Sequence, residues 1–430
     1  MFARISCMSW PMAASSAPAA PTSRWTWNVK AMRGSRRDGA AAPFPRKRRR
    51  PAPRSDLGPR LRGDMQGNSM TLALPNPRDE AWRWSDLSAL PALAAQIPGH
   101  GPVDPSPYWI GTGGLRLLFV DGRYDAAHSA PGPVMLGPLA IASDHPLGQL
   151  ATGQDGWTLS VPAGDTGSAA IEIVHIATGG ANHIPARIML ADGARASIVE
   201  THAGDGWSNR LTEIVLGTDA RLDRHVRLMQ ASGFTALRET ATAAAGAHLA
   251  ATLLALGDAG TRIDAALTLT GDAAHVAYGG ALLARDQQRH DAAVVVRHAA
   301  LDGVSRQHWR AVADDRATAS LAARVEVARD AQKTDGEQSL RGLLLRRTAT
   351  INLKPELEIF ADDVKCAHGA TVGELDAQAL WYLASRGVPP QPARALLTRA
   401  FVGDALDGID DEAVREAFRA AADLWLGAES

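Results

Sequence analysis

The sequence predicts a mostly β protein whose centre is a parallel β-helix, with a mixed segment before it and a helical module after it. Between residues 146 and 365, short runs of β-forming residues alternate with turns rich in Gly, Asp and Ala. The turns recur at a nearly constant spacing, as the positions of Ala194, Ala220 and Ala247 show. Recurrence in the twenties without long amphipathic helices indicates a solenoid with two strands per coil. An antiparallel sandwich is the alternative, because it also places short strands at regular intervals.

The strands of this central region are expected in runs of Val, Ile, Leu and Thr. About 210 residues of this texture would give roughly eight coils, each advancing by about 4.8 Å, the usual spacing between paired strands. The nine strand candidates are residues 170–176, 186–190, 196–200, 211–216, 222–228, 249–256, 263–269, 292–297 and 322–327.

Residues 70–145 form the expected mixed α/β segment. Residues 80–87 contain two tryptophans and predict a short helix or turn with two aromatic anchors. Residues 98–107 are rich in Pro and Gly and predict a linker. Residues 115–120 are apolar and predict a strand.

Residues 366–430 switch to helical periodicity. The pattern Thr371-x-x-Glu374 predicts a capping box at the start of a helix over 374–386. A second helix is expected over 392–401, with Gly403 as its C-cap.

A third helix is expected to begin after Asp410 or Asp411. Apolar stripes on these helices predict a surface that docks a partner. Alternatively they pack together and cover the open end of the β-helix, and both can be true. The docking candidates are Leu396, Leu397, Phe401, Phe418 and Trp425.

Residues 1–69 differ from the rest of the chain in charge. They carry 14 Lys and Arg against 3 Asp and Glu, while the remainder carries 31 against 43. We expect an unstructured extension, which is absent from the native protein if translation starts at Met65 or Met70. A basic arm for nucleic acid or an organelle transit peptide are alternatives for the head. The acidic body argues against a nucleic-acid or anionic-membrane partner, and no membrane-length apolar run is visible.

The most informative run is 361–373, which contains the only cysteine of the main body, Cys366, followed two positions later by His368. The other cysteine, Cys7, lies in the head, so a disulfide framework is absent and a reducing cytoplasm is expected. One thiol and one imidazole can help to hold a metal but cannot close a metal site alone. The alternative is a small buried cysteine and a histidine with ordinary polar partners.

Charged neighbours surround this pair. Lys365 precedes the cysteine, and Asp362 and Asp363 begin the run. Adjacent residues of a strand point to opposite faces, so the two aspartates are not an automatic acid–base pair. We expect them to form a turn or a cap, with Lys365 and Asp363 as support for an interface.

Familiar active-site motifs are absent. The dipeptide Gly-Lys occurs nowhere, which excludes the Walker A loop of P-loop ATPases. Gly111-Thr-Gly-Gly114 lacks the strand–turn–helix context of a dinucleotide fold, and neither a GxSxG elbow nor an HExxH pair is present. The missing motifs exclude most familiar active sites, but they do not exclude unfamiliar ones.

The chain from about Met70 onward resembles the SufD branch of the SufB/SufD family, the scaffold subunits of the SUF iron–sulfur cluster assembly machinery. The Cys-x-His-Gly-Ala-Thr-Val-Gly run distinguishes this branch from SufB. Further matching residues are Asp286-Gln287, His298, Gln307, Asp330-Ala-Gln-Lys-Thr-Asp335, Gln338, Leu343-Leu-Leu345, Lys354-Pro-Glu-Leu-Glu-Ile359 and Trp381-Tyr-Leu-x-Ser-Arg-Gly387.

The resemblance implies a right-handed parallel β-helix with helical segments at both ends. It implies a non-catalytic subunit that forms a heterodimer with SufB, or a homodimer in isolation. It further implies that the C-terminal helices bind the ATPase SufC, which would hydrolyse ATP. It also implies that His368 faces a cysteine of SufB and helps to hold a nascent iron–sulfur cluster, with Cys366 beside it. A reduced flavin on the complex is a further expectation. Imidazole must be neutral to bind a metal, so cluster loading should weaken at acidic pH.

Two other classes of function compete with this scaffold. A β-helix carbohydrate-active enzyme would use Asp362 and Asp363 as acid and base. A metal-free interaction module would need neither these aspartates nor the cysteine and histidine.

Overall fold

The computed structural model describes residues 74–427 apart from 77, 100 and 168. Contacts divide the chain into Met1–Asn68 and Ser69–Ser430, and the fold below is that of the second unit. The expectations for the basic head, including Cys7, lie outside the described residues.

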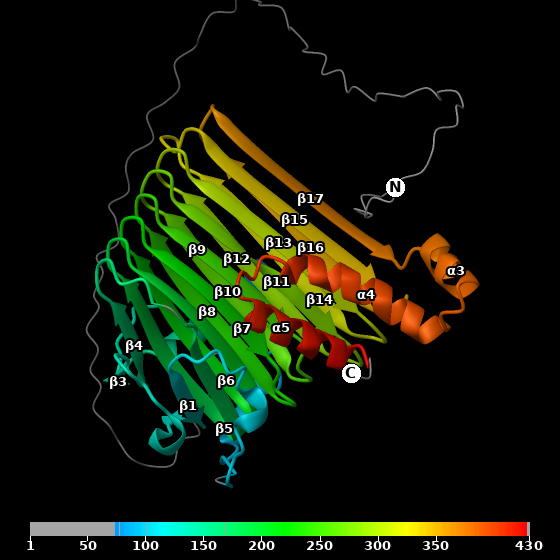
Figure 1. The fold of residues 1–430 in the computed structure, drawn as a ribbon, viewed down its shortest axis with the longest axis horizontal. Helices are drawn as coiled ribbons and strands as arrows, with labels where there is room; N and C mark the ends of the chain where they lie inside the picture. The colour runs from blue at the N-terminus through cyan, green and yellow to red at the C-terminus, as the bar shows by residue number, and fades with distance from the viewer. Residues whose placement is uncertain (1–73, 77, 100, 168, 428–430) are drawn as a thin grey trace, which may run out of the picture. The chain divides into compact units, whose positions relative to one another are not determined.

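The centre of this unit is a parallel β-solenoid of about seven turns, where roughly eight were predicted. The strands of successive coils pair in parallel, so the sandwich alternative is wrong. Figure 1 shows the strands running side by side along the solenoid. They are β4 (Asp155–Val161), β5 (Ile171–Leu190), β6 (Arg195–Leu216), β7 (Arg221–Leu228), β8 (Phe234–Ala243), β9 (His248–Ala255), β10 (Gly260–Leu269), β11 (His275–Ala284), β12 (Arg289–His298), β13 (Val304–Ala313), β14 (Thr318–Val327), β15 (Thr334–Leu344), β16 (Thr350–Ile359) and β17 (Val364–Glu374).

Each coil contributes one strand to each of two sheets. The first halves of β5 and β6 pair with each other, and the stack continues through β7, β9, β11, β13, β15 and β17. The other sheet runs from β4 through the second halves of β5 and β6 and continues through β8, β10, β12, β14 and β16. The sequence therefore predicted the two-strand coil correctly.

Glycine allows β5 and β6 to bend through one corner and pass from sheet to sheet. Gly180 in β5, Gly206 in β6 and Gly233 in the next coil all have a positive φ. A Cβ on Gly206 would lie 2.6 Å from the carbonyl oxygen of Gly180, and one on Gly233 would lie 2.0 Å from that of Gly206. The coils stack this closely only because these residues lack a side chain.

The opposite corner contains the recurrent turns that the sequence revealed. Ala194, Ala220 and Ala247 are fully buried there, one coil apart. Asp219 and Asp302 occupy the left-handed region at φ of 54° and 55°, which Asp tolerates better than most residues.

Aliphatic ladders fill the interior. Leu222, Leu249 and Val276 are paired in register on successive coils and are almost completely buried. Burying each such side chain stabilises the fold by about 1.5–3 kcal/mol relative to leaving it in water. This continuous ladder explains why a solenoid needs several coils to be stable.

The N-terminal segment packs on the solenoid. Its elements are η1 (Glu80–Trp82), α1 (Leu90–Ala95), η2 (Ser106–Tyr108), β1 (Arg116–Val120), β2 (Arg123–Tyr124), η3 (Ala126–His128), β3 (Met135–Pro138) and α2 (Pro146–Gln149). Trp82 is the buried aromatic anchor, and the Arg262 guanidinium lies 4.7 Å from its ring centroid. The predicted strand and short helix are thus confirmed.

Three helices follow the solenoid: α3 (Ala377–Ser385), α4 (Pro390–Leu406) and α5 (Glu412–Trp425). In Figure 1, α4 and α5 lie on an outer face of the solenoid, and α4 contacts β11 and β13. Helices α4 and α5 therefore cover a sheet face, whereas α3 buries no residue. The alternative in which the helices close the open end of the β-helix is wrong.

Several predicted helix boundaries also differ from the structure. Thr371 and Glu374 belong to strand β17, and Asp376 caps α3 by accepting from the backbone N–H of Gln378. The capping box is wrong because pairing with β15 extends the strand through it. Helix α4 continues through Gly403. The predicted cap of the third helix is confirmed at Asp411.

Candidate functional site at the open end of the solenoid

Strand β17 is the last strand of its sheet and forms an open edge. It pairs with β15 in register, and no other strand among the described residues pairs with it. Every residue from Ala367 to Glu374 is exposed. Unpaired backbone N–H and C=O groups on such an edge are a template for another strand.

The same end exposes residues that would be interior in a middle coil. Ile351 and Leu353 of β16 are only half-buried, and Val372 of β17 is 45% exposed. The register partners of Ile351 and Leu353 one coil earlier are Ala319 and Leu321, which are almost completely buried. The hydrophobic ladder of the solenoid therefore ends at an accessible edge, where Trp84 lines a cavity together with these residues.

Cys366 and His368 lie on β17 itself, two positions apart and therefore on one face of the strand. The thiol of Cys366 is partly buried against Val325 and Ala361. Opposite it in register is Gly336, whose missing side chain leaves room for the sulfur. Burial raises the pKa of the Cys366 thiol, and the nearby charge of Asp335 adds to this effect, so the thiol is protonated at neutral pH.

His368 is exposed, in contrast to the cysteine. Its register partner is Gln338, a buried residue with both side-chain polar atoms unpartnered. The thiol and the imidazole thus offer two candidate ligands at an accessible edge. They do not belong to any group of three or more possible ligands among the described residues.

The charged residues that precede Cys366 in the sequence do not lie beside its thiol. Lys365 alternates with Cys366 and so faces away from the thiol. Asp362 and Asp363 are exposed in the turn between β16 and β17. The backbone of Asp363 holds this turn: its N–H donates to Gln332, and its carbonyl accepts from Lys333. These contacts match the expected turn role of the aspartates.

The structure divides the predicted docking residues into two groups. Phe418 and Trp425 are buried between α5 and the solenoid, so a partner cannot reach them in this arrangement. Leu397 and Phe401 are half-buried, and Phe401 lies under the guanidinium of Arg310. Only Leu396 is well exposed.

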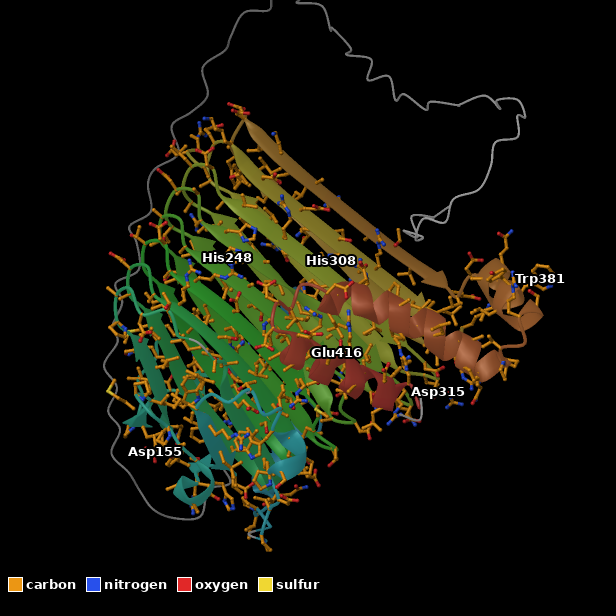
Figure 2. All side chains as sticks on the ribbon, viewed as in Figure 1. Asp155, His248, His308, Asp315, Trp381 and Glu416 are labelled. Atoms are coloured by element: carbon orange, nitrogen blue, oxygen red, sulfur yellow. The ribbon has the colours of Figure 1, made fainter. Side chains whose placement is uncertain are left out.

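Sequence reasoning missed more accessible apolar side chains on the same helices. Trp381 is 73% exposed on α3, and Tyr382 and Leu424 are also exposed; Trp381 is labelled in Figure 2 at the far side of the helical module. Beside them, Leu396 and Val388 line a groove of about 880 Å³. The apolar periodicity of these helices could have indicated the residues, but it does not reveal which side of each helix faces the solenoid.

Ion pairs attach the module to the solenoid. Asp404 of α4 accepts hydrogen bonds from Arg310 of β13, at 2.9 Å from its Nε. Asp410, just before α5, accepts from Arg221 of β7 at 2.7 Å. The module is therefore positioned by both polar and apolar contacts.

The helices themselves are not membrane spans. Within the described part of the chain, no helix is both long enough and apolar enough to cross a bilayer.

The fold and the open end together define a class of protein: a parallel β-solenoid with a cysteine and a histidine on an unpaired edge strand and with an outer helical module. The chain belongs to the family described as SUF system FeS cluster assembly, SufBD core domain, whose model matches residues 175–401. This confirms the resemblance found in the sequence.

Similar proteins carry matching names. The chain is 27% identical over 380 residues to the iron-sulfur cluster assembly protein SufD of Escherichia coli, covering 80% of this chain and 87% of that protein. It is 28% identical over 384 residues to an iron-sulfur cluster assembly SufBD family protein of Synechocystis, covering 79% and 84%. Over 118 residues it is 39% identical to the chloroplastic protein ABCI7 of Arabidopsis thaliana, covering 27% and 25%. The chain is thus a SufD-type protein of iron–sulfur cluster assembly.

Proposed function

We propose that this chain is a scaffold subunit that pairs with SufB, binds the ATPase SufC, and contributes His368 to a nascent iron–sulfur cluster. The observation that carries the proposal is the open edge of β17, which presents one thiol and one imidazole on the same face. A pair of ligands at an uncovered edge is what a site completed by a partner requires.

The pairing surface is the end of the solenoid. Its unpaired backbone groups can accept a partner strand, as in β-strand addition. Its half-buried Ile351 and Leu353 and exposed Val372 supply apolar surface to bury in the interface. A SufB subunit with a similar open end would continue both the hydrogen-bond ladder and the hydrophobic ladder. The same surface explains the expected homodimer of the isolated chain.

In the proposed site, His368 is the principal ligand and Cys366 supports it. Iron–sulfur clusters accept imidazole as well as thiolate ligands. The cysteine must lose a proton before it binds iron, and its raised pKa makes this costly at neutral pH. The imidazole of His368 is exposed and therefore accessible to a cluster that a partner also holds. The cluster is cargo on this scaffold, and its remaining ligands come from SufB.

We place SufC at the outer side of the helical module. Leu396, Trp381 and Tyr382 form the apolar surface for it, while Phe418 and Trp425 fix the module to the solenoid. ATP hydrolysis then belongs to SufC, which agrees with the missing Gly-Lys dipeptide. The reduced flavin stays an expectation for the complex, and the cytoplasm stays the expected location.

The carbohydrate-active alternative gains no support from the structure. Asp362 and Asp363 are exposed turn residues, and the backbone groups of Asp363 hydrogen-bond within the turn. The metal-free module is the alternative that an experiment must exclude.

The proposal is tested by anaerobic co-expression of the chain with SufB and SufC homologues. We expect a stable three-component complex that contains iron and acid-labile sulfide. A complex without iron would support the metal-free module, and no complex at all would contradict the proposed pairing.

A further inference from the structure

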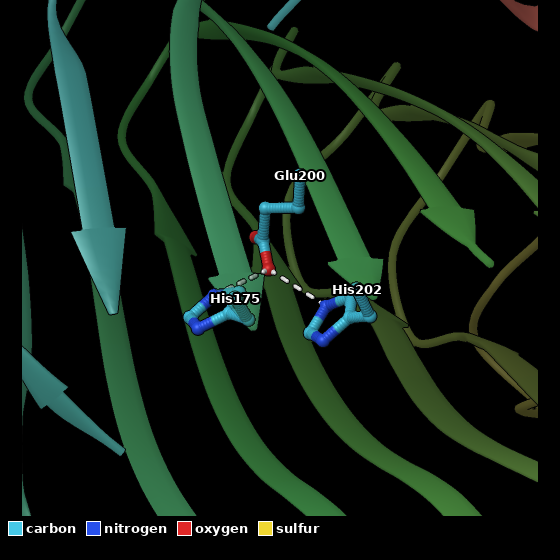
Figure 3. Close-up of side chains that lie close together, drawn as sticks. All are labelled: His175, Glu200 and His202. Carbon is cyan, nitrogen blue, oxygen red and sulfur yellow. Dashed lines mark ion pairs between the residues drawn. The ribbon is translucent and has the colours of Figure 1, made fainter. Parts of the chain in front are cut away.

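Two buried histidines and a glutamate lie together in the interior of the first coils, far along the chain from β17. His175 is on β5, and Glu200 and His202 are on β6 (Figure 3). The two histidines are register partners and thus occupy the same position in adjacent coils. All three side chains are at most 3% exposed.

The donor atoms of this cluster converge. The Glu200 Oε2 atom lies 3.8 Å from His175 Nε2 and 3.6 Å from His202 Nε2. Four-coordinate zinc with bonds of about 2.0–2.1 Å to each ligand places ligand atoms about 3.3 Å apart. The two glutamate–histidine distances therefore exceed this value by only a few tenths of an ångström, and all three ligand atoms lie within 4.8 Å of one another.

Neither histidine ring has a hydrogen-bond partner among the described residues. The four ring nitrogens of His175 and His202 are buried and make no hydrogen bond. Buried polar groups are normally hydrogen-bonded, and unsatisfied ones indicate an ion or ordered water. Glu200 is held by Arg224, whose Nε and Nη2 lie 3.1 and 2.8 Å from Oε1, so that Oε2 is turned to the histidines.

The protonation states suit ligation. Burial lowers the pKa of His175 well below its usual value and that of His202 to about 4, so both rings are neutral at pH 7. Burial opposes ionisation of Glu200, but the charge of Arg224 and its other partners outweigh it and lower the pKa to about 2. The cluster therefore offers two neutral imidazoles and one carboxylate.

We propose that His175, Glu200 and His202 bind one divalent first-row transition ion, Zn²⁺ or Fe²⁺, inside the solenoid. Two imidazoles and one carboxylate are a ligand set that both ions accept. The rings now stack with centroids 4.6 Å apart, and on binding they turn about their Cβ–Cγ bonds so that both Nε2 atoms face the ion. The ion links β5 to β6 and stabilises the first coils.

The donor atoms and the neighbouring charges together determine which metal ions this site binds. Arg224 is matched by Glu200 and Glu239. Arg210 is also close enough to lower the pKa of both histidines, and its positive charge opposes a cation. Mg²⁺ and Ca²⁺ depend on several oxygen ligands, and this site supplies one carboxylate. It therefore excludes them and retains ions with a strong affinity for imidazole.

The test uses the full-length chain carrying Cys366→Ser and His368→Ala, which removes the ligand pair of β17. The protein is unfolded, refolded with Zn²⁺ or, anaerobically, with Fe²⁺, desalted, and analysed for metal by mass spectrometry. We expect one ion per chain with Zn²⁺, Fe²⁺ or both, and none with Mg²⁺. His202→Gln and Glu200→Gln should weaken binding at least tenfold, since even the loss of outer-shell partners of metal ligands costs about 10–100-fold.

The matched control is His248→Gln. His248 stacks on His275 at 4.4 Å in the same solenoid, but that pair belongs to no group of possible ligands among the described residues. This variant should retain the ion. If the parent binds no ion, or if His202→Gln retains it as well as His248→Gln does, the cluster holds only water and the proposal is wrong.

A second measurement covers variants that fail to fold. Refolding the parent with Co²⁺ should give weak visible d–d bands of a nitrogen- and oxygen-ligated site. The absence of these bands in folded parent protein would overturn the proposal without any reference to the variants.

Discussion

Phe418 is the central anchor of the helical module, and replacing it with alanine should release α5 from the solenoid. The side chain is fully buried. Its ring meets His225 edge-on at 6.1 Å between centroids and lies 6.0 Å from the Arg227 guanidinium. Phe→Ala substitutions at buried sites cost about 3–5 kcal/mol. Because Phe418 joins α5 to the solenoid, we expect this cost to appear as easier opening of α5.

Hydrogen exchange measures that opening directly. A loss of about 3–5 kcal/mol corresponds to roughly 100- to 4,000-fold faster exchange through the opened state, with 1.4 kcal/mol for each factor of ten. The acceleration should be confined to Glu412–Trp425 and nearby segments, with β5 to β15 unaffected. Leu424→Ala is the control, because Leu424 is 74% exposed on the same helix and should change stability by no more than about 0.5 kcal/mol. Equal exchange in the two variants would refute the assignment of Phe418 as the anchor.

Three further predictions concern the partner surfaces and pH. Val372→Arg should leave the thermal midpoint nearly unchanged, since Val372 is 45% exposed and exposed substitutions change stability by about 0.5 kcal/mol or less. The substitution should weaken SufB binding at least about tenfold in a titration, because it buries a charge in the interface. The control is Leu301→Arg, which lies on an exposed turn. Equal affinities of the two variants for SufB would contradict the proposed pairing surface. Leu396→Asp should abolish co-purification of SufC but not of SufB, whereas normal SufC recovery would remove Leu396 from the docking surface. Burial lowers the pKa of His290 to about 4, so below pH 6.5 the unfolded chain binds a proton that the folded chain does not. The contribution of His290 to the free energy of unfolding should therefore be constant above pH 6.5. Between pH 6.5 and 4 this residue should lower the free energy of unfolding by about 1.4 kcal/mol per pH unit. His290→Gln should reduce that slope in urea titrations at several pH values, and an unchanged slope would exclude His290 as a contributor.

The sequence predicted the two-strand coil because its signal is local and repeated. Turn residues such as Ala194 and Ala220 recur once per coil, and strands such as β9 are predominantly apolar. Strand β13 was missed, although it is as regular as β9, because its inward positions include Ser305 and Gln307. Polar residues at interior positions hide the period of two on which strand recognition depends.

The site was predicted only in part for a related reason. Cys366 and His368 were recognised from their motif, but the strand that carries them was taken for a boundary, because Thr371-x-x-Glu374 matches a helix cap. Long-range pairing with β15 overrides that local preference. His175 and His202 carried a usable signal in their separation by one coil, but this signal has meaning only after the coil length is known.

The cluster content of the three-component complex tests the central claim most directly. Iron and acid-labile sulfide should be measured per complex after anaerobic purification with His368→Ala, with the unaltered chain, and with His128→Ala as a control for an exposed histidine on the N-terminal segment. We predict that all three chains form the complex, and that only His368→Ala loses most of its iron and sulfide. Equal cluster content in the three complexes would show that His368 does not hold the nascent cluster.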